Sequence, residues 1–276
     1  GVENYHTPQD SLASLDLASV QHAGDVALHT VRDFASEADR GEEAAYVYTD
    51  IAARAFVAAP LLYVQIALGV CVLIAAFAFW RAGAEGRWRA LAAPLASLAI
   101  AGVFAACAGF VLSALRPGES YAFAYPELSR AWCVFVALFA TATALMFARA
   151  HVNPTLAQSA AMVWFTLIGF AASFLLGGMS MLFALPALVF ALGCGVGFAW
   201  KPAQNIGGAL AAFVALAVWA PTLSLTELAL GFEFPFAIAL LFALVSLAWF
   251  GLLAQSHIGS WRAPVAIAAT AALVCV

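Results

Sequence analysis

The side chains best suited to metal or acid–base chemistry lie near the start of the chain. His6 stands in a polar loop, Tyr5-His6-Thr7-Pro8-Gln9-Asp10. Four further ionisable side chains recur at three- and four-residue spacing, which places them on one face of a helix. They are His22, Asp25, His29 and Asp33. Imidazole and carboxylate groups at that spacing can converge on a metal ion, but this face should point to water, so we interpret it as a solvated surface.

Other candidate groups are weaker. The five cysteines all fall in apolar runs without a CxxC spacing, which favours neither a zinc knuckle nor a disulfide framework. Glu227 and Glu233 are expected in a loop facing water. Gly193, Gly195 and Gly197 fail the spacing of a dinucleotide loop and indicate close helix packing instead. Gln65 is expected to form an interhelical hydrogen bond. The sequence therefore identifies no catalytic residue.

The composition indicates a membrane protein. Of 276 residues, 65% are apolar and only 9% are charged, whereas soluble domains are near half apolar and a quarter charged. This excludes an ordinary soluble domain and a disordered chain, and the net charge of −4 argues against a nucleic-acid partner. Residues 1–56 hold ten acidic residues and three arginines. An acidic head thus precedes a long apolar body.

Uncharged runs long enough to cross a bilayer as helices recur through residues 57–276. They are Val57–Trp80, Leu91–Leu115, Ala131–Ala148, Leu156–Leu176, Met181–Trp200, Ile206–Thr226 and Phe234–Ala254. An eighth run, Ala263–Val276, is too short to span. Pro94, Pro186 and Pro221 fall inside runs and are expected to kink or end helices, which membrane bundles tolerate.

The loop charges predict the orientation. The first, third, fifth and seventh loops hold six bases, against two in the others. By the positive-inside rule the odd loops are cytoplasmic, and residues 1–56 lie outside, in the periplasm if the membrane is a bacterial inner membrane. Tryptophans near the run ends fit an aromatic belt. They are Trp80, Trp88, Trp132, Trp200 and Trp261.

The head is predicted to contain one amphipathic helix, roughly Leu17–Ala35. Asp16 is a suitable N-cap because its carboxylate can accept from a free first-turn N–H. An apolar stripe recurs at three- and four-residue spacing. It comprises Leu17, Val20, Gly24, Ala27, Val31 and Phe34. Nothing else in residues 1–56 supplies a core for this stripe, so we expect one upstream of Gly1, in a longer parent protein.

The head also resembles a known family. The segment Gly1–Leu12, then Leu15-Asp16 and Ser19–Asp25, is similar to the end of the catalytic domain of dizinc aminopeptidases. The likeness is strongest to multi-pass members such as the endoplasmic-reticulum metallopeptidase and the vacuolar membrane protease. Val47-Tyr48-Thr49-Asp50, then Ala59-Pro60, resembles their junction into the first membrane helix, with Thr49 where an aromatic residue is expected.

This resemblance implies an activity and one ligand. In the family a Tyr-His-Thr-x-x-Asp loop delivers the last zinc ligand, a role that falls on His6. Two zinc ions and a carboxylate base then activate water for peptide-bond hydrolysis. The other ligands would lie outside this chain, which alone should be inactive. The parent is accordingly expected to be a membrane-bound zinc exopeptidase that acts on a peptide substrate, with an unknown oligomeric state.

Together these observations predict an all-α polytopic transmembrane bundle, with about seven complete spans and a truncated eighth. A short loop–helix remnant of an α/β zinc-peptidase domain precedes it. The expected divisions are 1–35 for the remnant, 36–56 for an acidic juxtamembrane linker and 57–276 for the membrane domain. The alternative is a multi-pass transporter, channel or membrane scaffold without a catalytic role. A transporter would usually carry charged or broken-helix sites at the midplane.

Overall fold

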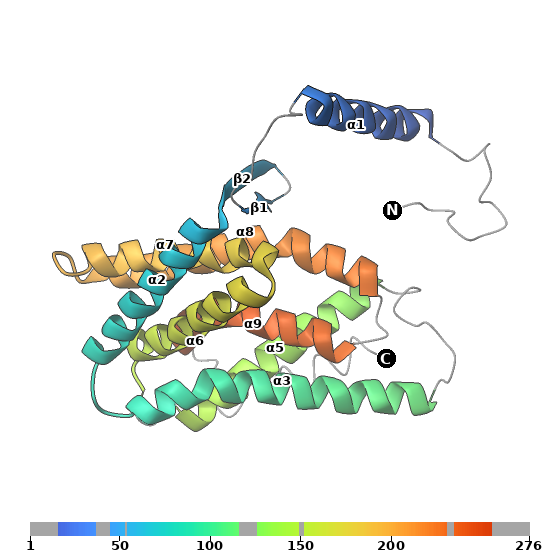
Figure 1. Ribbon diagram of the computed structural model, residues 1–276. Coiled ribbons are helices and arrows are strands. Elements are labelled where there is room, and N and C mark those ends of the chain that lie inside the picture. The colour runs from blue at the N-terminus through green and yellow to red at the C-terminus, as the bar shows by residue number, and fades with distance from the viewer. Residues whose placement is uncertain are drawn as a thin grey trace. The chain divides into compact units, whose positions relative to one another are not determined.

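The chain is mostly helical and divides into two compact units, residues 1–44 and 45–276. A computed structural model describes residues 16–36, 45–52, 54–115, 126–148, 152–230 and 235–255 (Figure 1). Within the first unit, the described element is helix α1 (Leu17–Ser36).

Helix α1 confirms the amphipathic helix predicted in the head. It begins at the expected residue and extends one residue further than expected. The Asp16 carboxylate accepts the backbone N–H of Ala18 at 3.0 Å and the hydroxyl of Ser19 at 3.2 Å, so it caps the helix as predicted. Every residue from 16 to 32 is exposed, including Leu17 and Val31 of the apolar stripe.

The second unit contains seven helices that are long and apolar enough to cross a membrane, counted over the described residues. They are α2 (Leu61–Arg81), α3 (Arg87–Leu115), α5 (Pro126–Ala148), α6 (Pro154–Leu175), α7 (Ser180–Val196), α8 (Pro202–Leu230) and α9 (Pro235–Gln255). The 3-10 turn Gly177–Met179 joins α6 to α7. The seven spans are confirmed, and the eighth run lies outside the described residues.

Proline defines where several of these helices begin. Helices α5, α6, α8 and α9 each start at a proline, whose fixed φ suits the first turn and whose missing N–H would have no helical partner there. Before α6, the Asn153 side chain also accepts the backbone N–H of Leu156 at 2.7 Å. These helix starts are therefore determined by residues adjacent in the sequence and do not depend on packing between helices.

A β-hairpin that the sequence analysis does not predict precedes the first span. Strands β1 (Tyr46–Ile51) and β2 (Ala55–Pro60) pair antiparallel, and β2 leads directly into α2 (Figure 1). The first apolar run therefore begins as a strand and not as a helix. Pro60 explains this boundary, because proline disfavours helical geometry in the residue before it. Ala52 in the turn has a φ of 52°, a left-handed conformation uncommon for a residue other than glycine.

Contacts between the loops confirm that the chain alternates between two ends of the bundle. The side-chain amide of Asn153, before α6, donates to the carbonyl of Ala82, after α2, at 3.4 Å. The Arg81 guanidinium lies 4.6 Å from the ring centre of Phe198, in the α7–α8 loop. We call this the arginine end.

The other end is marked by the hairpin, and we call it the hairpin end. A side chain at Gly177 would contact Leu61, the first residue of α2, and Val47 of β1. The hairpin therefore lies at the same end of the bundle as the start of α2 and the α6–α7 junction.

The core of the bundle is closely packed between α6, α7 and α8. The rings of Phe165 and Phe183 lie 5.0 Å apart, and Trp219 packs edge-on against Phe183 at 5.1 Å. Helices α7 and α8 also approach through two glycines. A Cβ on Gly193 would lie 2.6 Å from the Cα of Gly207. The expected packing role is confirmed for Gly193.

Gly193→Ala should destabilise the bundle, because its new methyl group would press on the backbone of α8. Overpacking of this kind costs about 1–3 kcal/mol. Gly195→Ala is the matched control two residues away, since a Cβ there meets no described atom within 4 Å. The thermal unfolding temperature of the detergent-solubilised protein should fall for the first variant and stay level or rise for the second. Equal shifts would contradict the close α7–α8 contact.

Candidate functional site

The candidate metal ligands are not brought together in the described part of the chain. His6 lies outside the described residues. His22, Asp25 and His29 are exposed on α1, and Asp25 accepts a hydrogen bond from the Gln21 amide at 2.8 Å. Asp33 falls within α1. Among the described residues, no three His, Cys, Asp or Glu side chains could hold a metal ion together. These residues alone do not fit a zinc centre.

Instead, two hydrogen bonds between elements of the membrane unit end on carbonyls that prolines leave without a helical donor. Proline has no N–H, so the carbonyl four residues earlier loses its hydrogen bond. Pro186 in α7 affects Leu182, whose carbonyl accepts the indole N–H of the buried Trp219 at 3.1 Å. The freed acceptor of α7 is thus satisfied by α8.

The same arrangement joins α8 to the hairpin. Pro221 in α8 removes the helical donor for the carbonyl of Ala217. The backbone N–H of Ala52, in the hairpin turn, donates to that carbonyl at 2.9 Å. Ala52, the turn residue with a positive φ, therefore supplies the donor that Pro221 removes from α8.

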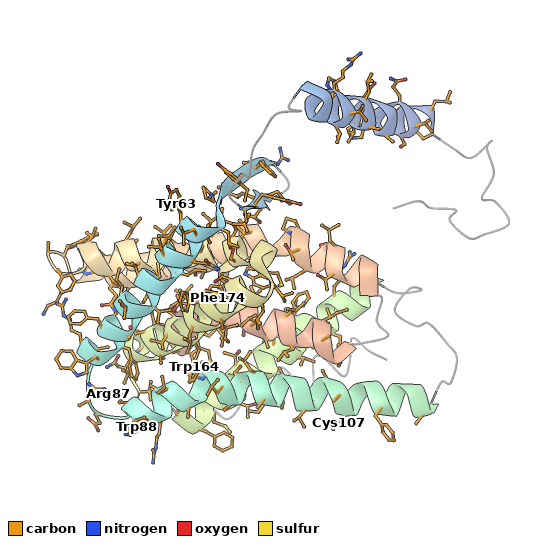
Figure 2. The ribbon with its side chains drawn as sticks, in the orientation of Figure 1. Tyr63, Arg87, Trp88, Cys107, Trp164 and Phe174 are labelled. Carbon is orange, nitrogen blue, oxygen red and sulfur yellow. The ribbon has the colours of Figure 1, made fainter. Side chains whose placement is uncertain are left out.

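The third proline inside a span lies close to a similar contact. Pro94 in α3 removes the helical donor for the Ala90 carbonyl. The neighbouring carbonyl, that of Leu91, accepts the indole N–H of Trp164 at 2.8 Å (Figure 2). Trp164 belongs to α6, so this hydrogen bond ties α6 to α3 beside the proline.

Side chains also satisfy carbonyls at the helix ends, which lack intrahelical partners. The Gln65 amide donates to the carbonyl of Ser173, near the end of α6, at 3.2 Å. This confirms its predicted interhelical role. At the arginine end, the Arg87 guanidinium donates to the carbonyl of Trp80, in the last turn of α2, at 2.8 Å and to that of Gly83, in the following loop, at 3.1 Å.

A chain of three buried hydroxyls joins α3, α5 and α9. Ser97 lies 3.1 Å from Thr141, and Thr141 lies 3.1 Å from Ser246, oxygen to oxygen. Because Ser246 donates to the carbonyl of Ala243 at 2.6 Å, it accepts from Thr141, which in turn accepts from Ser97. The chain has one direction and ends on a backbone acceptor. The sequence analysis did not identify it.

Gln158 of α6 is the second polar group that sequence reasoning missed. Its amide donates to the Ala248 carbonyl at 3.1 Å and accepts the Gly251 N–H at 2.7 Å, both in α9. A Cβ on Gly251 would overlap this side chain, and one on Gly208 would lie 3.2 Å from its Cγ. Because Gly208 and Gly251 have no side chains, there is space for Gln158. A glycine on each of the two neighbouring helices was the sequence signal that could have indicated this polar contact.

These groups act as joints between helices. The joints within the spans are uncharged hydroxyl, amide and indole groups. Among described residues, no buried side-chain nitrogen or oxygen lacks a hydrogen-bond partner. Glu227, expected in a loop, instead lies in the last turns of α8, and Glu233 falls outside the described residues. The described cysteines form no disulfide. This arrangement supports helix association.

Comparisons with protein-family models, curated proteins and solved structures find no match to this chain. Seven apolar helices, with polar joints between them, are the architecture of a multi-pass integral membrane protein.

Thr141→Val should lower stability, because it breaks the hydroxyl chain while keeping the side-chain shape. Hydrogen bonds of this kind within membranes contribute about 0.6–1.7 kcal/mol. Thr143→Val is the matched control, since the Thr143 hydroxyl bonds only within its own helix, to the Phe139 carbonyl at 2.7 Å. Thermal unfolding in detergent should show the larger loss for Thr141→Val. A larger loss of stability for Thr143→Val would contradict the role of the hydroxyl chain in holding the helices together.

Proposed function

We propose that this chain is the membrane part of a zinc-dependent exopeptidase, together with the last segment of its catalytic domain. One observation carries the proposal. Three features follow one another in the order found in membrane-tailed dizinc aminopeptidases. They are the loop Tyr5-His6-Thr7-Pro8-Gln9-Asp10, a helix capped by Asp16 and a set of membrane spans. The cap and the spans support that order, while the loop itself lies outside the described residues.

The exposed stripe of α1 supports a missing soluble domain. Leu17, Val20 and Val31 are all exposed, so α1 presents apolar side chains that a partner surface would cover. Helices that lie on membranes are rich in Lys and Arg on their polar face. The polar side of α1 instead carries Asp25 and Asp33, with Arg32 its one Lys or Arg. Protein is therefore a better partner for this stripe than an anionic lipid surface.

The proposed zinc site needs more ligands than this chain supplies. His6 would be one ligand, and the others would come from the upstream part of the parent. When bound, two zinc ions supply an activated water for peptide hydrolysis. The isolated chain should have no activity. The loop charges place residues 1–56 and the catalytic domain outside the cytoplasm in this proposal, for which a bacterial inner membrane is the expected location.

Transport is less well supported as the role of the membrane unit. Transport pathways usually contain charged residues or broken helices at the bilayer midplane. Here the buried polar side chains of Gln158 and Thr141 bond to neighbouring helices. Such groups favour a stable anchor for a catalytic domain.

Within the full-length parent, His6→Ala should remove bound zinc and lower peptidase activity by about 100-fold or more, since loss of a direct ligand should cost at least as much as loss of a residue supporting one. His22→Ala is the control, because His22 is exposed on α1. Zinc content and hydrolysis of an aminoacyl substrate would both be measured. Full zinc content and activity in the His6 variant would exclude the proposed ligand role, and a parent without zinc would exclude the peptidase itself.

A further inference from the structure

The hairpin has two faces of different character. Residues paired across an antiparallel ladder share a face, so the register assigns each side chain. One face carries Val47 and Thr49, which are buried, with Val57 and Ala59 partly buried beside the bundle core. The opposite face is aromatic. It carries Tyr46, Tyr48 and Phe56, which are 60%, 65% and 69% exposed.

The aromatic face is held outward by the bundle. The rings of Tyr48 and Phe56 stack across the strands with centres 5.4 Å apart. The inner face is anchored by burial of Val47 and by the hydrogen bond from Ala52 to the Ala217 carbonyl. Turning the aromatic rings inward would break both attachments. The exposed rings therefore form a fixed surface, which we call the outer aromatic face (Tyr46, Tyr48 and Phe56).

This surface continues into the side of α2 that must face lipid. Exposed apolar side chains follow that helix from its first turn to its last. They are Leu62, Tyr63, Ile66, Val70, Leu73, Phe77 and Trp80. Figure 2 shows Tyr63 directed away from the bundle, next to the point where β2 joins α2. Since α2 is a membrane span, its exposed stripe contacts lipid, and the outer aromatic face lies where that stripe reaches the hairpin end.

We propose that the outer aromatic face lies in the phospholipid headgroup layer and anchors the hairpin end of the protein there. Tyrosine suits this layer because its ring is apolar and its hydroxyl is polar. The open edges of a two-stranded sheet are also acceptable there, where water is present, but not in the hydrocarbon core.

The arginine end provides the matching anchor on the opposite side of the bundle. Trp80, Trp88 and Trp200 are exposed there, beside Arg81 and Lys201. The hairpin end differs in chemistry, because the outer face of the two strands carries no basic residue and includes Asp50, while the hairpin's one arginine, Arg54, lies in the turn. Its attachment to lipid therefore comes from the aromatic rings rather than from attraction to anionic headgroups. It should be insensitive to salt.

Spin labels can measure how deeply the outer aromatic face lies. Tyr46→Cys, Tyr48→Cys and Phe56→Cys would be labelled one at a time in the full chain, with Cys107 and Cys275 replaced by serine. The protein would be reconstituted in vesicles of phosphatidylcholine with anionic phosphatidylglycerol, so that raised salt would screen any attraction to charged headgroups. Relative accessibility to molecular oxygen and to a nickel chelate reports depth, since oxygen partitions into the bilayer and the chelate stays in water.

Two control labels set the scale. Leu73→Cys, exposed midway along α2, should report the hydrocarbon core, and Ala84→Cys, in the α2–α3 loop, should report water. The hairpin labels should fall between them and stay there when salt is raised. Water-like accessibility at all three positions would overturn the proposal. So would poor access to both reagents, which would show that protein covers this face. Unchanged thermal unfolding would verify that each labelled variant is folded.

Discussion

The hydrogen-bonding requirement of backbone carbonyls in a lipid environment determines how this bundle is assembled. A carbonyl left without a donor in hydrocarbon costs several kcal/mol. Pro186 and Pro221 each create such an acceptor, and each acceptor is satisfied by a different element. Trp219 thereby fixes α8 against α7, and Ala52 fixes the hairpin against α8. The position of the hairpin, and with it the direction of its outer aromatic face, follows from the Ala52 hydrogen bond and the burial of Val47.

The remaining helices cannot associate by burying apolar groups, because such burial contributes little free energy in a lipid environment. Lipid tails are as apolar as leucine, so close packing and interhelical hydrogen bonds must hold the helices together. Gly193 and Gly207 provide close packing, whereas Gln158 and Thr141 provide hydrogen bonds between helices. Helix α6 contributes to many of these joints, through Gln158 to α9 and through Trp164 to α3. It is therefore a central element of the membrane unit.

The sequence predicts the spans well because their signal is local. Charge-free runs and the cap at Asp16 each depend on a few adjacent residues, and the structure confirms them. The hairpin was missed because Val57–Pro60 is as apolar as the helix that follows. The donors of Trp219 and Gln158 could not be paired with acceptors, since their partners are distant in sequence. A tryptophan in one span and a proline in the span before it, as in α8 and α7, was the usable signal. The proposed ligand His6 depends on resemblance alone.

The two exposed apolar surfaces near the start of the chain call for different partners, and their charges distinguish them. The stripe of α1 is accompanied by Asp25 and Asp33, and anionic headgroups would repel such a helix. A soluble domain of the same parent protein fits it better. The outer aromatic face of the hairpin presents tyrosines next to a lipid-facing helix, which suits the headgroup layer. In the proposed peptidase, a hairpin fixed to both the bundle and the membrane surface would give the upstream catalytic domain a firm base.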